Sequence, residues 1–308
     1  MKLVINQDIS FAYVNQKAQK IQELSQLFDL QLSNGYIKPS GVSYLSSLMY
    51  PKTTFLRDVE HSNDEKFRYL QRTNFFQNLG IELEEDFHRN SVSDNMLECT
   101  KVAKNNDPDF IDERLKKILK AHLGSKEHLI LGILLTTYEV VDNILEHSKG
   151  GDFQLGDRLL EIPGFVCAQY YGGNKDMIQI GISDSGIGIV ESMKDAYTDL
   201  TRKDILKKAF ELNTTRHIKI MPSRGNGLAK LKEFVLESHG DLICRTNEFR
   251  IHFNLEYPNG IIHKENFDVI GTHFEINIGC GHDIDTRKIF NAEPGDYETD
   301  DFEDFFDF

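Results

Sequence analysis

MIQIGISDSGIGI, residues 177–189, is the stretch that decides the fold. Its isoleucines at 178, 180 and 182 alternate with polar or small residues, and this period of two predicts a strand with one face on a core. The strand ends where Asp184 is followed by Gly186 and Gly188, and two glycines so close together allow a tight backbone path. The segment therefore predicts a strand over 177–183 that leads into a glycine turn carrying a carboxylate.

The segments around this strand predict a helix-and-sheet domain over residues 126–282. Residues 165–170 are expected to pair with the strand as a hairpin around Gly172-Gly173-Asn174. Apolar periodicity predicts the remaining elements, with helices at 127–146, 204–212 and 228–237 and strands at 241–245, 249–256 and 272–278. This order favours an α+β fold in which helices cover one face of a mostly antiparallel sheet.

Residues 1–90 predict a separate small α/β domain. A strand is expected at 2–5, a helix at 12–28 and a turn at Asn34-Gly35. A further helical segment at 67–81 contains Gly80, which suits a helix C-cap.

Two segments outside these domains are expected to be connections. Residues 91–125 read as a polar linker followed by a connecting helix at 110–123. Residues 283–308 form an acidic tail with several phenylalanines, whose charge density favours disorder. Docking of these aromatic residues on a basic, apolar groove of a partner is the alternative.

Composition narrows the class of function. The 308 residues carry a formal net charge of −14, and residues 293–308 hold eight acids and no base, so more than half of the excess lies in the tail. Nucleic-acid binding depends on clustered Lys and Arg, which this balance argues against. The longest apolar window, 129–135, is far shorter than the roughly 20 residues that span a bilayer, and the N-terminus has no apolar signal core. We expect a cytoplasmic protein with no membrane association.

The four cysteines show neither CxxC spacing nor pairing with histidine. They are expected to be reduced and mostly buried.

The helix expected at 127–146 contains the first candidate site, Glu139 and Asn143 in EVVDN. Residues four apart project from one helix face about one turn apart. A carboxylate and a carboxamide at the edge of a buried face need a shared polar partner. Mg²⁺ with phosphates would serve, because this ion takes oxygen ligands and keeps several waters. Taken alone, the motif is more often a solvated polar face.

The second candidate site is SDSGIGI at 183–189. The Asp184 carboxylate at the strand end could accept a hydrogen bond from an adenine amino group. Taken alone, the motif is more often a simple turn before a helix that starts near Glu191.

The third candidate site is SRGNGLAKLKEFV at 223–235. Gly225 and Gly227 precede a helix, and a glycine-rich loop at a helix N-terminus offers N–H groups and a favourable dipole to phosphate oxygens. Capping of that helix by Ser223 or Asn226 is an equal alternative.

The order of the three sites favours one shared ligand. ExxxN lies on a helix, DxGxG at a strand end and GxG at a helix start, which are the elements that each chemistry requires. Gly271-Thr272 then opens the strand THFEINI and places a hydroxyl where it could sit beside adenine and Asp184.

As a set, EVVDN, SDSGIGI, GNGLA and GTHFEI resemble the sequence boxes of the GHKL ATPases, the superfamily of gyrase B subunits, ninety-kilodalton heat-shock chaperones and sensor histidine kinases. The resemblance covers about residues 126–279 and implies a Bergerat-type helix/sheet sandwich that binds ATP and Mg²⁺. It implies Glu139 as general base, Asn143 as Mg²⁺ ligand, and Asp184 and Thr272 as adenine contacts. The implied cofactor-binding residues are Asn143, Asp184, Gly186, Gly188, Arg224, Gly225, Gly227, Leu228 and Thr272.

The same resemblance identifies residues 209–224 as a mobile ATP lid. Arg216 and Arg224 flank it and could clamp a phosphate, or equally be solvated charges. His147, one turn after the first site, is a candidate to approach the phosphates, and a surface histidine is the commoner alternative. In the N-terminal domain, KPSGVSYLSSL and YLQRTNFFQNLGI are similar to the STAS-like domain that precedes the ATPase module in some stand-alone bacterial members.

Two departures from the family bear on mechanism. No histidine phosphoacceptor segment of the kinase type precedes the ATPase module, and only about 30 residues follow the strand at 272–278, too few for a gyrase-type transducer domain. We therefore expect an ATP-dependent regulatory switch with weak hydrolysis that acts on a protein partner or as a homodimer. A protein kinase of the anti-sigma-factor type and an ATP-gated module without hydrolysis stay open as alternatives.

Overall fold

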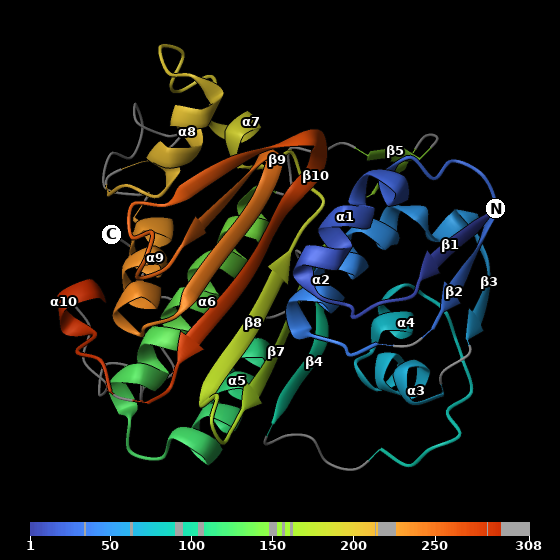
Figure 1. Cartoon of the computed structure of the whole chain (residues 1–308), viewed down its shortest axis with the longest axis horizontal. Coiled ribbons are helices and arrows are strands. Elements are labelled where there is room, and N and C mark those ends of the chain that lie inside the picture. Colours follow the sequence, from blue (N-terminus) through green and yellow to red (C-terminus); the bar gives the residue numbers. More distant parts are fainter. Residues whose placement is uncertain are drawn as a thin grey trace.

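The structure is a computed structural model that describes residues 1–33, 35–61, 64–89, 95–103, 108–147, 153–155, 158–160, 163–212, 214, 226–281 and 283–290 (Figure 1). In chain order the elements are β1 (Lys2–Ile5), α1 (Phe11–Gln22), β2 (Phe28–Leu32), α2 (Pro39–Met49), the 3-10 helix η1 (Tyr50–Phe55), β3 (Leu56–His61), α3 (Asp64–Arg72), α4 (Phe75–Asn78), β4 (Met96–Val102), α5 (Pro108–Leu123), α6 (Glu127–His147), β5 (Phe153–Leu155), β6 (Arg158–Leu160), β7 (Gly164–Tyr171), β8 (Met177–Ser183), α7 (Ile189–Met193), α8 (Arg202–Ala209), α9 (Gly227–Glu237), β9 (Asp241–Phe253), β10 (Ile261–Gly279) and α10 (Arg287–Phe290).

The main sheet has five antiparallel strands in the order β4-β7-β8-β10-β9. β8 is its central strand, and Ile180 of β8 pairs with Ile276 of β10. The isoleucines at 178, 180 and 182 are fully buried, as expected for a strand whose apolar face meets a core. The hairpin of β7 and β8 and the mixed α+β class expected from the sequence are therefore confirmed.

Helices α5, α6 and α9 cover one face of this sheet (Figure 1). The side chains of α6 and α9 approach closely because Gly132 lies against the ring of Phe234, where a larger side chain would overlap it. The apolar residues of these helices join those of β8, β9 and β10 in one core. This face carries the helices that contain the first and third candidate sites.

The N-terminal segment packs on the opposite face of the main sheet (Figure 1). It contains the three-stranded parallel sheet β1-β2-β3 and helices α1 and α2. Every residue of α2 is buried, and a Cβ at Gly181 of β8 would overlap Ser40 of α2. Cys99, Phe165 and Cys167 of the main sheet belong to the same apolar cluster as the N-terminal residues, so the two parts share a core.

Two predictions about the N-terminal segment were wrong in extent. The helix expected at 12–28 ends at Gln22, because the chain turns at Glu23 and Phe28 starts a strand that pairs with β1. The helical segment expected at 67–81 is divided between α3 and α4, since Asn74 adopts a left-handed φ of 60° that a continuous helix excludes. Gly80, with φ 72°, follows the end of α4 as expected.

The linker expected within 91–125 includes a strand that the sequence analysis missed. Met96–Val102 forms β4, the edge strand that pairs with β7 and buries Met96, Leu97 and Cys99. The connecting helix is present as α5. The strand was missed because polar and charged residues surround it, so that the average polarity of 84–108 indicated a linker.

Several elements of the main sheet also differ in length from the prediction. The strands expected at 241–245 and 249–256 are one strand, β9, and the strand expected at 272–278 is the second half of β10. The four cysteines are buried free thiols, as expected. Within the described ranges, no helix combines the length and the apolar character needed to cross a bilayer. Asn34 and residues 291–308 of the expected tail lie outside the described residues.

Candidate functional site

Asp184 lies directly after the last residue of β8 and is only 8% exposed. Its Oδ1 accepts a hydrogen bond from Gly186 N at 2.7 Å, and its own N–H donates to Thr272 O at 2.9 Å. Burial raises the pKa of this carboxyl to about 6, while hydrogen bonds from the backbone N–H groups of Gly186 and Thr272 oppose the rise. A buried carboxyl with a raised pKa is typical of functional sites.

Thr272 is brought next to Asp184 by the pairing of β10 with β8. Gly271 has φ 87°, and a Cβ at this position would overlap the carbonyl oxygen of Asp184. Only a glycine therefore allows the two backbones to approach this closely. The Thr272 hydroxyl, 7% exposed as a residue, lies 3.3 Å from the Thr246 hydroxyl. The adjacency of Asp184 and Thr272 that the sequence suggested is thus present.

The glycine turn after Asp184 is held by two residues of β9. Thr246 Oγ1 accepts a hydrogen bond from Ile189 N at 2.9 Å, and Asn247 Oδ1 accepts one from Val190 N at 3.1 Å. A Cβ at Gly188, which has φ 82°, would lie 2.7 Å from Asn247 Oδ1. The sequence analysis missed Thr246 and Asn247. The unusual TNE within an apolar strand is the signal that could have identified them.

Glu139 and Asn143 are both half-buried on α6, one turn apart. Asn143 Nδ2 donates to Glu139 O at 2.7 Å, so Oδ1 is the atom that Asn143 can offer to a cation. A Cβ at Gly227 would overlap Glu139 Oε2. The carboxylate of the first candidate site therefore lies against the first residue of α9, which belongs to the third candidate site.

Toward the upper side of Figure 1, β8 and α6 end and α9 begins. Gly186 lies in the turn after Asp184, and Leu228 packs against the core beneath α9. Arg216, Arg224 and Gly225 lie outside the described residues, as do most of the expected lid and the side chain of His147. The structure thus brings together Glu139 with Gly227, and Asp184 with Thr272, at one end of the main sheet.

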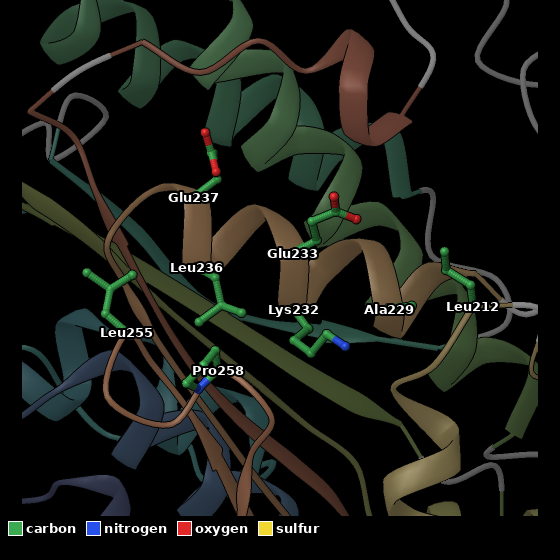
Figure 2. Close-up of a pocket in the computed structure, with 8 residues that line it drawn as sticks. All are labelled: Leu212, Ala229, Lys232, Glu233, Leu236, Glu237, Leu255 and Pro258. Atoms are coloured by element: carbon green, nitrogen blue, oxygen red, sulfur yellow. The ribbon is translucent and has the colours of Figure 1, made fainter.

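A shallow surface pocket of about 420 Å³ lies on the outer side of α9 (Figure 2). Its lining residues are Leu212, Ala229, Lys232, Glu233, Leu236, Glu237, Leu255 and Pro258. None of the predicted site residues contributes to it. Its walls combine exposed leucines with two carboxylates, which fits neither a phosphate nor a buried adenine ring.

Similarity to known proteins gives no independent guide to the site. No protein-family model matches the chain, and no curated protein matches it either. Among the described residues, no cluster of three or more His, Cys, Asp or Glu side chains could hold a metal ion.

Proposed function

We propose that this chain binds ATP with Mg²⁺ at the end of the main sheet and acts as an ATP-dependent regulatory switch with weak hydrolysis. One observation carries the proposal: two pairs of residues that are distant in sequence meet at glycines. Gly271 allows Thr272 to reach Asp184, and Gly227 allows the start of α9 to reach Glu139. These two pairs bring together four sequence segments, and we propose that one nucleotide bridges the pairs, with adenine at Asp184 and Thr272 and the phosphates with Mg²⁺ at Glu139, Asn143 and Gly227.

The chemistry around Asp184 suits an adenine ring. A buried, ionised carboxylate whose Oδ1 is already oriented by Gly186 N can accept a hydrogen bond from an exocyclic amino group. Guanine carries a carbonyl oxygen at the corresponding position, which would face the carboxylate as a second acceptor. The site is therefore proposed to select adenine over guanine.

The chemistry around Glu139 suits a triphosphate. Asn143 Oδ1 would serve as one ligand of Mg²⁺, and a bound Mg²⁺ would neutralise charge on the phosphates. The Glu139 carboxylate is proposed to orient and deprotonate the attacking water. The N-terminus of α9 beside it offers N–H groups to phosphate oxygens. Phosphoryl transfer depends mainly on such positioning and charge stabilisation.

The architecture agrees with a member of the GHKL superfamily. The five-stranded antiparallel sheet with α6 and α9 on one face supports the proposal of a Bergerat-type sandwich. The N-terminal segment, with its parallel sheet and packed helices, is proposed to be a STAS-like domain.

Calorimetric titration of ATP with Mg²⁺ tests the proposal. The wild type is expected to bind, and Asp184→Asn is expected to bind at least about tenfold more weakly, equivalent to about 1.4 kcal/mol. Asp199→Asn is the matched control, because Asp199 is exposed on the segment before α8, and it should bind as the wild type does. Absence of heat with the wild type, or equal affinities for all three proteins, would reject the proposal.

Phosphate release from the same proteins distinguishes the modes of action. Slow release of inorganic phosphate by the wild type is expected for a weak ATPase. Binding without any release would instead favour an ATP-gated module, and transfer of the γ-phosphate to another protein would favour a kinase.

A further inference from the structure

The backbone next to Thr272 is held by hydrogen bonds from the N-terminal segment. β10 departs from regular pairing with β9 between Lys264 and Thr272, where two register shifts form an irregular bulge. Gln22, the last residue of α1, spans this bulge. Its Nε2 donates to Asp268 O at 2.9 Å, and its Oε1 accepts from Ile270 N at 3.0 Å. Both ends of one carboxamide therefore fix the main chain just before Gly271.

A second contact from the N-terminal segment reaches the residue after Thr272. His273 is fully buried, and its ring stacks on Tyr44 of α2 with centroids 3.8 Å apart. His273 Nε2 lies 2.9 Å from Ile270 O, so it carries the proton and donates. Nδ1 lies 3.3 Å from the oxygen of the Ser47 hydroxyl, whose proton is donated to Tyr44 O. The imidazole thus joins the bulge of β10 to α2.

A third contact reaches the turn that follows β8. The Ser185 hydroxyl donates to Ser47 O at 2.5 Å. Ser185 is adjacent to Asp184, and Ser47 is the residue whose side chain also meets His273. One position on α2 therefore contacts both backbone segments that flank the proposed adenine site.

A fourth contact holds the strand next to the bulge. Arg245 of β9 pairs across the sheet with His273 and is fully buried. Its Nε donates to Asn15 Oδ1 of α1 at 3.0 Å, and one terminal nitrogen donates to Phe267 O at 2.7 Å. Asn15 Oδ1 also accepts from the Tyr44 hydroxyl at 3.2 Å. The polar groups of this interface are therefore partnered, which gives it a defined geometry.

We propose that α1 and α2 position the adenine-facing backbone at Asp184–Ser185 and Ile270–His273, so that the N-terminal segment sets the affinity and base selectivity of the nucleotide site. The positioning residues are Gln22, Ser47 and Tyr44. This inference rests on the proposed function for its ligand. Whether or not nucleotide is bound, loosening these contacts is expected to displace Asp184 relative to Thr272. By linkage, a ligand or partner that moves α1 or α2 changes nucleotide affinity, and nucleotide changes its affinity by the same factor.

Gln22→Ala is the informative variant, because Gln22 is half-exposed and its loss leaves the core intact. Affinities for ATP and GTP are measured by calorimetry with Mg²⁺. The ratio of the two affinities is expected to fall on the order of tenfold, since a displaced carboxylate no longer discriminates an amino group from a carbonyl. A variant that is merely less folded would lose both affinities equally and keep the ratio.

Gln19→Ala is the matched control on the same helix, because Gln19 is exposed and its amide bonds only to Glu23. Ser185→Ala is the second variant, with Ser192→Ala as its control, since the Ser192 hydroxyl bonds within its own helix to Ile189 O. Lower ratios in Gln22→Ala and Ser185→Ala but not in the controls would support the inference. Unchanged ratios in both variants would overturn it while leaving ATP binding by the wild type intact.

Hydrogen exchange on the nucleotide-free proteins tests the same inference without any ligand. The Asp184 amide, which donates to Thr272 O, is expected to exchange about tenfold faster in Gln22→Ala than in Gln19→Ala. Equal rates would overturn the positioning role even if no nucleotide binds. Failure of the wild type to bind ATP, together with faster exchange in Gln22→Ala, would instead reject the proposed function alone.

Discussion

The carboxylate of Glu139 on α6 lies directly against the backbone of Gly227, the first residue of α9. A Cβ atom at position 227 would overlap Glu139 Oε2, with Glu139 Cδ at 3.0 Å. The obstructing atom is the end of a flexible side chain rather than backbone. An alanine at 227 can therefore be accommodated, but only if the carboxylate moves.

Gly227→Ala is expected to separate stability from turnover. Alanine favours a helix over glycine by up to about 1 kcal/mol, which offsets the rearrangement of Glu139, so the melting temperature should change by less than about 4 °C. ATP hydrolysis should fall at least about tenfold, because a small displacement of a catalytic group is costly. Thermal unfolding and phosphate release measure the two effects. Gly281→Ala, where a Cβ meets no atom within 4 Å, is the control, and equal turnover in both variants would contradict the assignment.

Glu139→Gln tests the role of the carboxylate without changing its shape. A carboxamide cannot accept a proton from water, so turnover is expected to fall by about 100-fold or more while the ATP dissociation constant stays within about threefold. Single-turnover hydrolysis and calorimetry give the two values. Glu233→Gln on the exposed side of α9 should leave both unchanged. Hydrolysis at the wild-type rate by Glu139→Gln would show that another group acts as the base.

The sequence predicted the helices and strands of the site better than the long-range contacts that hold them in place. Met177–Ser183 and the helix carrying Glu139 follow from strict periodicity, and both were correct because their apolar faces meet the core. The hydrogen bonds by which Thr246 and Asn247 hold the glycine turn were not predicted, because they depend on the register between β9 and β10. A two-residue displacement of that register would change these partners without changing any local pattern.

The burial of α2 could not be predicted from the sequence either. A helix with four serines reads as a surface segment, yet every residue of α2 is buried. The Ser43 and Ser47 hydroxyls donate to helix carbonyls of Ser40 and Tyr44, which satisfies them internally. Their small size also lets α2 approach Gly181 of β8. Such packing requires knowledge of the opposite strand, so the contact between the two parts of the chain could not be derived from either alone.

Gly188→Ala should destabilise the fold whether or not nucleotide binds. Gly188 has φ 82°, which costs an alanine about 1 kcal/mol, and the new Cβ would lie 2.7–2.8 Å from Asn247 and Thr246. We expect the free energy of unfolding to fall by about 2–3 kcal/mol in denaturant titrations. Gly173→Ala shares the positive φ of 68° but meets no atom within 4 Å. It should therefore lose only the conformational part, about 1 kcal/mol, and equal losses would mean that the contact with β9 is unimportant.

Asp184 should make the protein less stable as the pH rises through 6. Its pKa is about 6 in the folded protein against an ordinary value of 3.8, so the folded state holds the proton more tightly. The associated stabilisation is complete below about pH 4 and lost as the pH rises through about 6. Asp184→Asn removes this dependence and retains an oxygen for Gly186 N. Between pH 5 and pH 8, the difference in unfolding free energy between wild type and Asp184→Asn should therefore shift by about 1 kcal/mol in favour of the variant. Urea titrations at the two pH values measure this shift, with Asp199→Asn as the control that should show none.

Since the same carboxylate must be ionised to accept the adenine amino group, ATP affinity of the wild type should weaken several-fold on going from pH 7 to pH 5. A stability difference independent of pH, or tighter ATP binding at pH 5, would mean that Asp184 is neither buried nor ionised in the manner inferred.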